Sequence, residues 1–323
     1  MWFIITAMNK RIIIAFSALF LLSACAPAAA MVVATYTPSP APTETPQPTR
    51  TPFPTPEPSP YSLDALRART YGQGKFTVDK LWYTYDLFDR YYIIYESDGL
   101  DIHGYVNVPK SEGPHPVVIA LHGYIPPDEY QTLDYTTRYA DDMAQAGFIV
   151  LHPNMRNFPP SDSPGRVRDS NTGYTVDVLN LMAYLRQGAG QEESIFKTAD
   201  LDRIGIWGHS IGGSIALRTM SVESEAIKAA VLYAAVSQRY ATVVDGDGIY
   251  DLSESDAPFS IHHGEVDEVI SVYQSWDLCR QLTQLQKDVD CYFYEGQPHT
   301  FYRDTWADPL FTERTIEFFN ENL

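Results

Sequence analysis

The feature that most constrains the fold is the pentapeptide Gly208-His-Ser-Ile-Gly212, which lies between a strand-like run, 202–207, and a helix-like run, 212–220. In a Gly-x-Ser-x-Gly motif of this kind the serine occupies a sharp, strained turn between strand and helix. The flanking glycines have no Cβ that would clash with either element. The pattern predicts that Ser210 presents its hydroxyl at a strand end, and an ordinary glycine turn is the alternative.

Nucleophilic chemistry at Ser210 would require two further side chains. A serine hydroxyl is a weak nucleophile, so a histidine must take its proton and a carboxylate must orient that histidine. After this motif the chain order is serine, acid, histidine. Asp267 follows a strand-like run at 258–263, and His299 follows another at 289–294. Because parallel strands end at a common edge, we expect both side chains beside Ser210.

Other residues compete for these two roles. Glu265 and Glu268 flank Asp267, and each is otherwise read as a solvated loop charge. His262 and His263 lie within or at the end of the strand, where a hydrogen-bonded core role is expected. Only His299 follows the acid in sequence, so it is the predicted base.

A tetrahedral intermediate also needs backbone N–H groups directed at its oxyanion. The amide of Ile211, directly after the serine, is the first candidate. A buried strand at 116–121 opens into His122-Gly123-Tyr124, and the amide of Tyr124 is the second candidate. The alternative for this segment is an ordinary strand end.

Strands and helices alternate from Lys75 onward, which predicts one doubly wound α/β domain with a mostly parallel sheet and an antiparallel pair of first strands. The expected strands are 91–96, 102–108, 116–121, 148–153, 204–207, 229–234, 258–263 and 289–294. The expected helices are 132–146, 175–186, 212–220, 272–285 and 312–320.

Four segments together resemble an α/β-hydrolase, and more narrowly the catalytic domain of the prolyl oligopeptidase group and its dienelactone-hydrolase-like relatives. They are His122-Gly123, 202–213, 263–267 and 298–301, in family order within about residues 75–323. The resemblance implies the α/β-hydrolase fold, a triad of Ser210, Asp267 and His299, and cleavage of ester or amide bonds through an acyl-enzyme without a cofactor.

The chain departs from the peptidases of that group in two ways. No internal blade repeat of about 40 residues appears in the sequence, and no acidic motif that would grip a peptide amino terminus is identifiable. A prolyl-oligopeptidase-like peptidase and a carboxylesterase therefore both stay open. A catalytically silent, surface-tethered binding module with the same fold is the alternative from another class.

Two cysteines fall within the domain. Cys279 lies on the helix after Asp267 and Cys291 on the last strand. These elements are neighbours in such a fold, so a disulfide is one expectation and two unpaired thiols are the other. No His/Cys cluster has metal-ligand spacing, so no metal site is predicted.

Residues 1–24 have the pattern of a signal peptide, with Lys10-Arg11 before an apolar run too short to span a bilayer. Leu22-Ser-Ala-Cys25 resembles a bacterial lipobox, in which Cys25 is lipid-modified. Cleavage among the neighbouring alanines is the alternative, and Met1 and Met8 are both candidate starts. The expected location is the bacterial cell envelope, outside the cytoplasm, or the medium if the chain is released.

Residues 25–61 form a predicted tether and residues 62–323 the catalytic domain. Alternating prolines at 37–60 favour polyproline II, which at about 3.1 Å per residue would extend roughly 70 Å.

The chain has 23 basic and 41 acidic residues, a net charge of −18. Without residues 1–24 the counts are 21 and 41, a net charge of −20. Such a surface repels nucleic acid and anionic lipid, so the expected partners are a small neutral ester or peptide and a membrane reached only through the anchor. Arg156, Arg166 and Arg168 are read as solvated loop charges, with a hold on a substrate carboxylate as the alternative.

The lipid anchor can be tested directly. Cells labelled with radioactive fatty acid should incorporate label into the wild-type chain, whereas the Cys25→Ser variant should carry none, because its serine lacks the thiol that is acylated. Labelling of Cys25→Ser would contradict the anchor.

Overall fold

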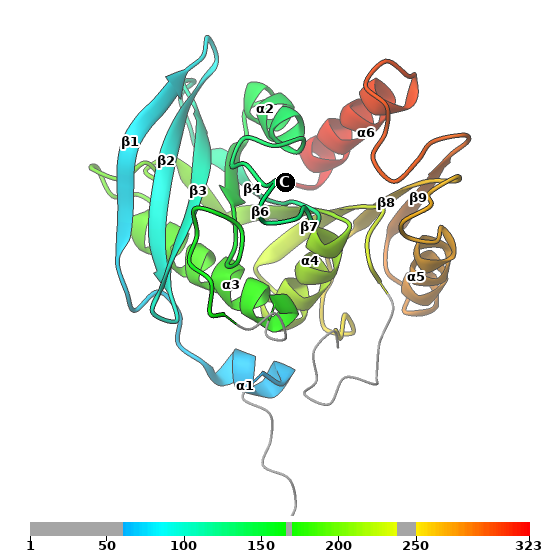
Figure 1. Cartoon of the computed structure of the whole chain (residues 1–323), viewed down its shortest axis with the longest axis horizontal. Coiled ribbons are helices and arrows are strands. Elements are labelled where there is room, and N and C mark those ends of the chain that lie inside the picture. The colour runs from blue at the N-terminus through cyan, green and yellow to red at the C-terminus, as the bar shows by residue number, and fades with distance from the viewer. Residues whose placement is uncertain (1–60, 166–169, 238–249) are drawn as a thin grey trace, which may run out of the picture. The chain divides into compact units, whose positions relative to one another are not determined.

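The computed structural model describes residues 61–165, 170–237 and 250–323, which form a nine-stranded sheet with helices on both faces (Figure 1). The predicted signal peptide, Cys25 and most of the predicted tether lie outside the described residues, as do Arg166 and Arg168.

The sheet has the strand order β1-β2-β3-β5-β4-β6-β7-β8-β9. The pairings β1–β2, β2–β3 and β3–β5 are antiparallel, and every pairing from β5 through β4 to β9 is parallel. The strands are β1 (Phe76–Thr84), β2 (Phe88–Ser97), β3 (Leu100–Pro109), β4 (His115–Leu121), β5 (Ile149–Pro153), β6 (Ala199–His209), β7 (Ile227–Tyr233), β8 (Phe259–Gly264) and β9 (Val289–Tyr294).

Each face of the sheet is covered by its own set of helices. Along β4, Val117, Ile119 and Leu121 join the apolar cluster under α3, α4 and α5, while Val118 and Ala120 join the cluster under α2 and α6. This alternation follows from the two-residue period of a strand. The helices are α1 (Leu63–Ala68), α2 (Thr137–Gln145), α3 (Ser170–Gly188), α4 (Ile211–Val222), α5 (Tyr273–Gln284) and α6 (Ala307–Asn322). Among the described residues, no helix combines the length and apolar character needed to cross a membrane.

The predicted doubly wound sheet with antiparallel first strands is confirmed. Two elements were missed. β1 pairs with β2 through two register shifts and exposes side chains on both faces, so it has no simple alternating pattern. α1 has only six residues. The helix predicted at 132–146 begins at Thr137, which leaves 132–136 in the loop after β4.

The sheet order places two important loops side by side. The chain leaves β4 for β5 on one side and later returns to β6 on the other, so β4 and β6 are neighbours with opposite connections. Leu121 at the end of β4 pairs with Gly208 near the end of β6. Open α/β sheets bind ligands at such a switch point, beyond the carboxyl ends of the strands.

The short helix α1 fastens the start of the described domain to α4. Leu66 is fully buried, and the guanidinium of Arg67 donates two hydrogen bonds, of 3.0 and 2.7 Å, to the carbonyl of Ser221. The contact lies at the end of α4 that is remote from β6.

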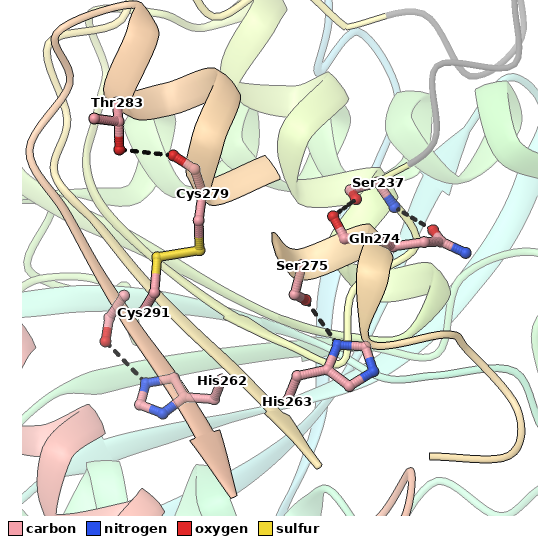
Figure 2. The surroundings of a disulfide bond; sticks show 9 residues. Ser237, His262, His263, Gln274, Ser275, Cys279, Thr283 and Cys291 are labelled. Carbon is pink, nitrogen blue, oxygen red and sulfur yellow. Dashed lines mark hydrogen bonds between the residues drawn. A yellow bond between two sulfur atoms is a disulfide. The ribbon is translucent and has the colours of Figure 1, made fainter. Parts of the chain in front are cut away.

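A disulfide joins Cys279 on α5 to Cys291 on β9 (Figure 2). It closes a loop whose ends are 12 residues apart and ties α5 to the edge strand of the sheet. Of the two expectations for these cysteines, the structure has the paired one.

Replacing both cysteines with serine should lower the free energy of unfolding by about 3 kcal/mol, because the open loop regains entropy in the unfolded chain. For a domain of this size the melting temperature should fall by roughly 6–12 °C. Thermal unfolding with and without a reductant measures the effect, and reduced wild type should behave like the double variant. An unchanged melting temperature in both would contradict the prediction.

Candidate active site

Ser210 occupies the turn between β6, which ends at His209, and α4, which begins at Ile211. Its φ of 56° and ψ of −119° lie outside the regions that side-chain-bearing residues normally adopt. Such strain persists only where the surroundings fix it. Here the amide of Ser210 donates to the carbonyl of Tyr233 at 3.0 Å, and its carbonyl accepts from the amides of Gly213 and Val236, each at 3.0 Å.

The outer glycines of the motif are required by close backbone contacts. A Cβ on Gly208 would lie 2.5 Å from the carbonyl oxygen of Gly212. A Cβ on Gly212 would overlap the carbonyl of Leu121 and lie 2.7 Å from that of His122. The contacts at Gly208 and at Gly212 are too short for a Cβ atom, so the turn can form only with glycine at these two positions.

The predicted acid and base are in direct contact. Nδ1 of His299 lies 2.7 Å from Oδ2 of Asp267. The side chain of Asp267 is fully buried, and that of His299 is 15% exposed. An ionised carboxylate only accepts hydrogen bonds, so Nδ1 carries the proton and Nε2 of neutral His299 keeps a free lone pair. Glu265 and Glu268 are exposed, which leaves Asp267 as the carboxylate of this loop that touches His299.

Asp267 accepts three further hydrogen bonds. The amides of Val269 and Ile270 donate to Oδ1 at 2.8 Å each, and Nε2 of His263 lies 2.9 Å from Oδ2. Burial by itself would raise the pKa of Asp267, but the bonds from His263 and His299, together with the Ile270 amide, outweigh burial and lower it. Asp267 is therefore held as a carboxylate.

His263 is buried and hydrogen-bonded, as expected for a strand histidine, but its partner is Asp267. Its Nδ1 lies 2.7 Å from Oγ of Ser275, a hydroxyl that can donate (Figure 2). Its Nε2 faces two acceptors, Asp267 and the carbonyl of Ile270 at 3.0 Å. The proton therefore sits on Nε2, and His263 orients the carboxylate.

Gly264 brings together the loops that carry Asp267 and His299. A Cβ at this position would overlap the carbonyl of Gln297 and lie 2.5 Å from that of Pro298. The amide of Val266 also donates to the carbonyl of Gln297 at 3.1 Å. The two loops thus run in backbone contact beyond the adjacent ends of β8 and β9.

The amides of Ile211 and Tyr124 are the two donors that the sequence predicts for an oxyanion. Neither donates a hydrogen bond to another residue in the described ranges. A Cβ on Gly123 would lie 3.1 Å from Cβ of Ser210, so the loop after β4 runs directly beside the serine. The ring of buried His122 lies between the carbonyls of Gly123 and Asn154, with Nδ1 at 2.7 Å from the first and Nε2 at 2.8 Å from the second.

The loop that carries His299 is fixed from two sides. Nε2 of His209 lies 3.0 Å from the carbonyl of His299, and the amide of Phe301 donates to the hydroxyl of Tyr233 at 2.5 Å. No hydrogen bond joins Ser210 to His299 in this part of the described chain. Such bonds are often long without substrate and tighten in the complex.

Arg156 is not the solvated loop charge that the sequence predicts. It is buried and pairs with the buried carboxylate of Asp177, with Nη2 at 2.7 Å from Oδ1. A buried arginine without this partner would be costly, so the ion pair explains its position. Within the described residues, no group of three or more His, Cys, Asp or Glu side chains is arranged to hold a metal ion.

The model of the dienelactone hydrolase family matches residues 102–322, which is more than half of the chain. Among curated proteins, Protein usf of Aquifex pyrophilus is 22% identical over 236 residues, covering 71% of this chain and 97% of that protein.

Two solved structures illustrate the range of similar folds. Acetyl xylan esterase 1 from Thermoanaerobacterium sp. has a TM-score of 0.60 and 18% identity, with 82% of this chain and 94% of that chain covered. Acylaminoacyl peptidase from Pyrococcus horikoshii has a TM-score of 0.55 and 20% identity, with 74% of this chain but only 42% of that chain covered. This chain therefore spans about two fifths of the peptidase, and the expected α/β-hydrolase fold is confirmed.

Replacing Asp267 with Asn should lower the free energy of unfolding at pH 7 by about 1–3 kcal/mol, because the carboxylate accepts bonds from four donors. The pKa of Asp267 is lowered in the folded protein, so its stabilisation is complete above the unfolded pKa near 3.8 and is lost as the pH falls through the folded one. Urea unfolding at pH 7, 5 and 3 should show a constant difference that narrows only at pH 3. The exposed Asp202→Asn variant is the control, and a difference that grows on acidification would contradict this assignment.

Proposed function

The chain belongs to the dienelactone hydrolase family, and we propose that it is a serine hydrolase that cleaves carboxylic esters through an acyl-enzyme formed on Ser210. Family membership itself indicates a hydrolase of ester or amide bonds. The observation that carries the finer proposal is the contact between Asp267 and His299 beside the strained turn at Ser210.

In the first half of the proposed reaction, Nε2 of His299 takes the proton of Ser210 as Oγ attacks the substrate carbonyl. Asp267 accepts the Nδ1–H bond throughout and stabilises the imidazolium that forms. The carbonyl π electrons move to the oxygen, which becomes an oxyanion. Collapse of this intermediate breaks the bond to the leaving group, and His299 returns the proton to the departing alkoxide.

Water completes the cycle. His299 removes a proton from water as its oxygen attacks the acyl carbon, and a second oxyanion forms. When this intermediate collapses, Ser210 leaves and recovers its proton from His299, so the carboxylic acid is released and the enzyme is regenerated. The free amides of Ile211 and Tyr124 would hold the oxyanion in both halves of the reaction. A preorganised donor of this kind contributes about 3–4 kcal/mol to catalysis.

An ester is favoured over a peptide because the sequence has no identifiable acidic motif that would grip a peptide amino terminus. Peptidase activity is the second candidate, because the same nucleophile, base and oxyanion donors would serve both reactions.

The surroundings of the site favour a substrate with a neutral, apolar part. Large apolar side chains are exposed on the same three segments that carry the second amide, the acid and the base. They are Tyr124, Val266, Val269, Tyr302 and Trp306. Tyr124, which is 61% exposed, directly follows Gly123, the residue whose backbone runs beside Ser210. The net charge of −18 disfavours anionic substrates. The proposed setting is the cell envelope, with the domain attached through Cys25.

The decisive comparison pairs the purified protein with its Ser210→Ala variant, on matched short-chain esters and peptide anilides. We expect ester turnover and reaction of Ser210 with a fluorophosphonate, seen by mass spectrometry, and a loss of at least about 1,000-fold in turnover in Ser210→Ala.

The outcomes separate the candidates. Cleavage of anilides that disappears in Ser210→Ala would make the protein a peptidase. Turnover that persists unchanged in Ser210→Ala would overturn the proposed nucleophile. No turnover, no labelling and saturable binding of a wall polymer would favour the catalytically silent binding module.

A further inference from the structure

A chain of hydrogen bonds crosses the site behind the reacting groups. The amide of Gly123 donates to Oη of Tyr135 at 2.9 Å. The same hydroxyl contacts Nδ1 of His209, and Nε2 of His209 lies 3.0 Å from the carbonyl of His299. This series of hydrogen bonds therefore connects the loop after β4, the turn at the serine and the loop that carries the base.

The protons in this chain have one consistent arrangement. The carbonyl of His299 can only accept, so Nε2 of His209 carries the proton. In a neutral ring Nδ1 is then an acceptor, and the hydroxyl of Tyr135 must be the donor to it. Burial raises the pKa of Tyr135 and lowers that of His209 to about 3, so both groups are neutral near pH 7. Hydrogen bonds that point in one direction strengthen one another.

Packing in the main core does not account for Tyr135. The residue is partly exposed and belongs to neither apolar cluster of the sheet, and its ring meets that of His209 edge to face at 5.3 Å. Tyr130, on the same loop, is a useful contrast. It is buried in the larger cluster against His122 and Phe158, and its hydroxyl has no hydrogen-bond partner in the described structure.

The two ends of this series of hydrogen bonds contact peptide groups that adjoin the second oxyanion donor and the base. At one end, Tyr135 holds the amide of Gly123, while Nδ1 of His122 lies 2.7 Å from the carbonyl of the same residue. The next amide is that of Tyr124, the second proposed oxyanion donor. At the other end, His209 holds the carbonyl of His299, and the two imidazole rings lie 4.6 Å apart.

We propose that Tyr135 and His209 are positioning residues that hold the Tyr124 amide and the His299 imidazole at a fixed separation across Ser210. The proposal rests on the serine-hydrolase function above. Neither side chain exchanges a proton with the substrate. Loss of the Tyr135 hydroxyl would leave the Gly123 amide and Nδ1 of His209 without partners, and both loops could then shift.

The first test compares Tyr135→Phe with Tyr130→Phe, each of which loses one hydroxyl from the same loop. Tyr135→Phe should lower kcat for an ester by roughly 10–100-fold with KM changed less than about 2-fold, because only transition-state interactions are weakened. Tyr130→Phe should keep the wild-type kcat. A Tyr135→Phe variant with wild-type kcat, or with a changed KM and an unchanged kcat, would overturn the proposal.

A double variant tests whether the two residues act as one unit. His209→Phe keeps a ring but removes both nitrogens. If the chain works as a unit, Tyr135→Phe/His209→Phe should lose no more activity than the more impaired single variant. Losses that multiply would contradict a shared role, and if His209→Phe does not fold, the tyrosine comparison alone decides.

A spectroscopic measurement separates this proposal from the proposed function. In ¹⁵N NMR of the histidine side chains, His209 should carry its proton on Nε2 in the wild type and in Tyr130→Phe, and the signal of its unprotonated Nδ1 should shift in Tyr135→Phe, because that nitrogen loses its hydrogen bond. A wild-type His209 protonated on Nδ1 would overturn the chain of hydrogen bonds whether or not the protein is active. Failure of Ser210 to react with a fluorophosphonate would instead overturn the proposed function.

Discussion

Three backbone hydrogen bonds hold Ser210 in a conformation that an L-residue rarely adopts, and the site depends on that constraint. Two of the bonds join Ser210 to Tyr233 at the end of β7 and to Val236 just after that strand, and the third joins it to Gly213 in the first turn of α4. The serine is therefore fixed mainly by the strand next to its own. The same tight turn brings Gly212 against the carbonyl of Leu121 and sets the loop after β4 beside the serine. A local strain is thus maintained by the packing of the parallel strands.

The sequence was sufficient for the parts of the site that local pattern determines. The Gly-x-Ser-x-Gly turn, and two loops that each follow an apolar strand, could be located without coordinates. Asp267 was predicted over Glu265 and Glu268 from its position in the loop after Gly264. The burial of its side chain and its contact with His299 are properties that only the structure provides, because all three residues are carboxylates in one short loop.

Contacts between distant segments were the part that sequence reasoning missed. Arg156 appeared to be a loop charge, yet its partner Asp177 lies on α3 and both are buried. His263 was expected in the core, and only its position just before Gly264 indicated that it could reach the acid loop. Tyr135 had been placed inside a predicted helix, because the periodicity continued into the loop. His263 and Tyr135 contact the candidate site through hydrogen bonds from other segments, and no sequence motif identifies such residues.

The two ends of helix α4 lie next to different parts of the domain. Ser210 precedes its first residue, and the segment that begins the described domain is fastened near its last turn through Arg67 and Ser221. Twelve helical residues separate these ends by about 18 Å. The first residues of the described domain therefore lie at the pole opposite the serine. Coupling the domain to a solid support at Tyr61 should leave the serine side free for large or insoluble substrates.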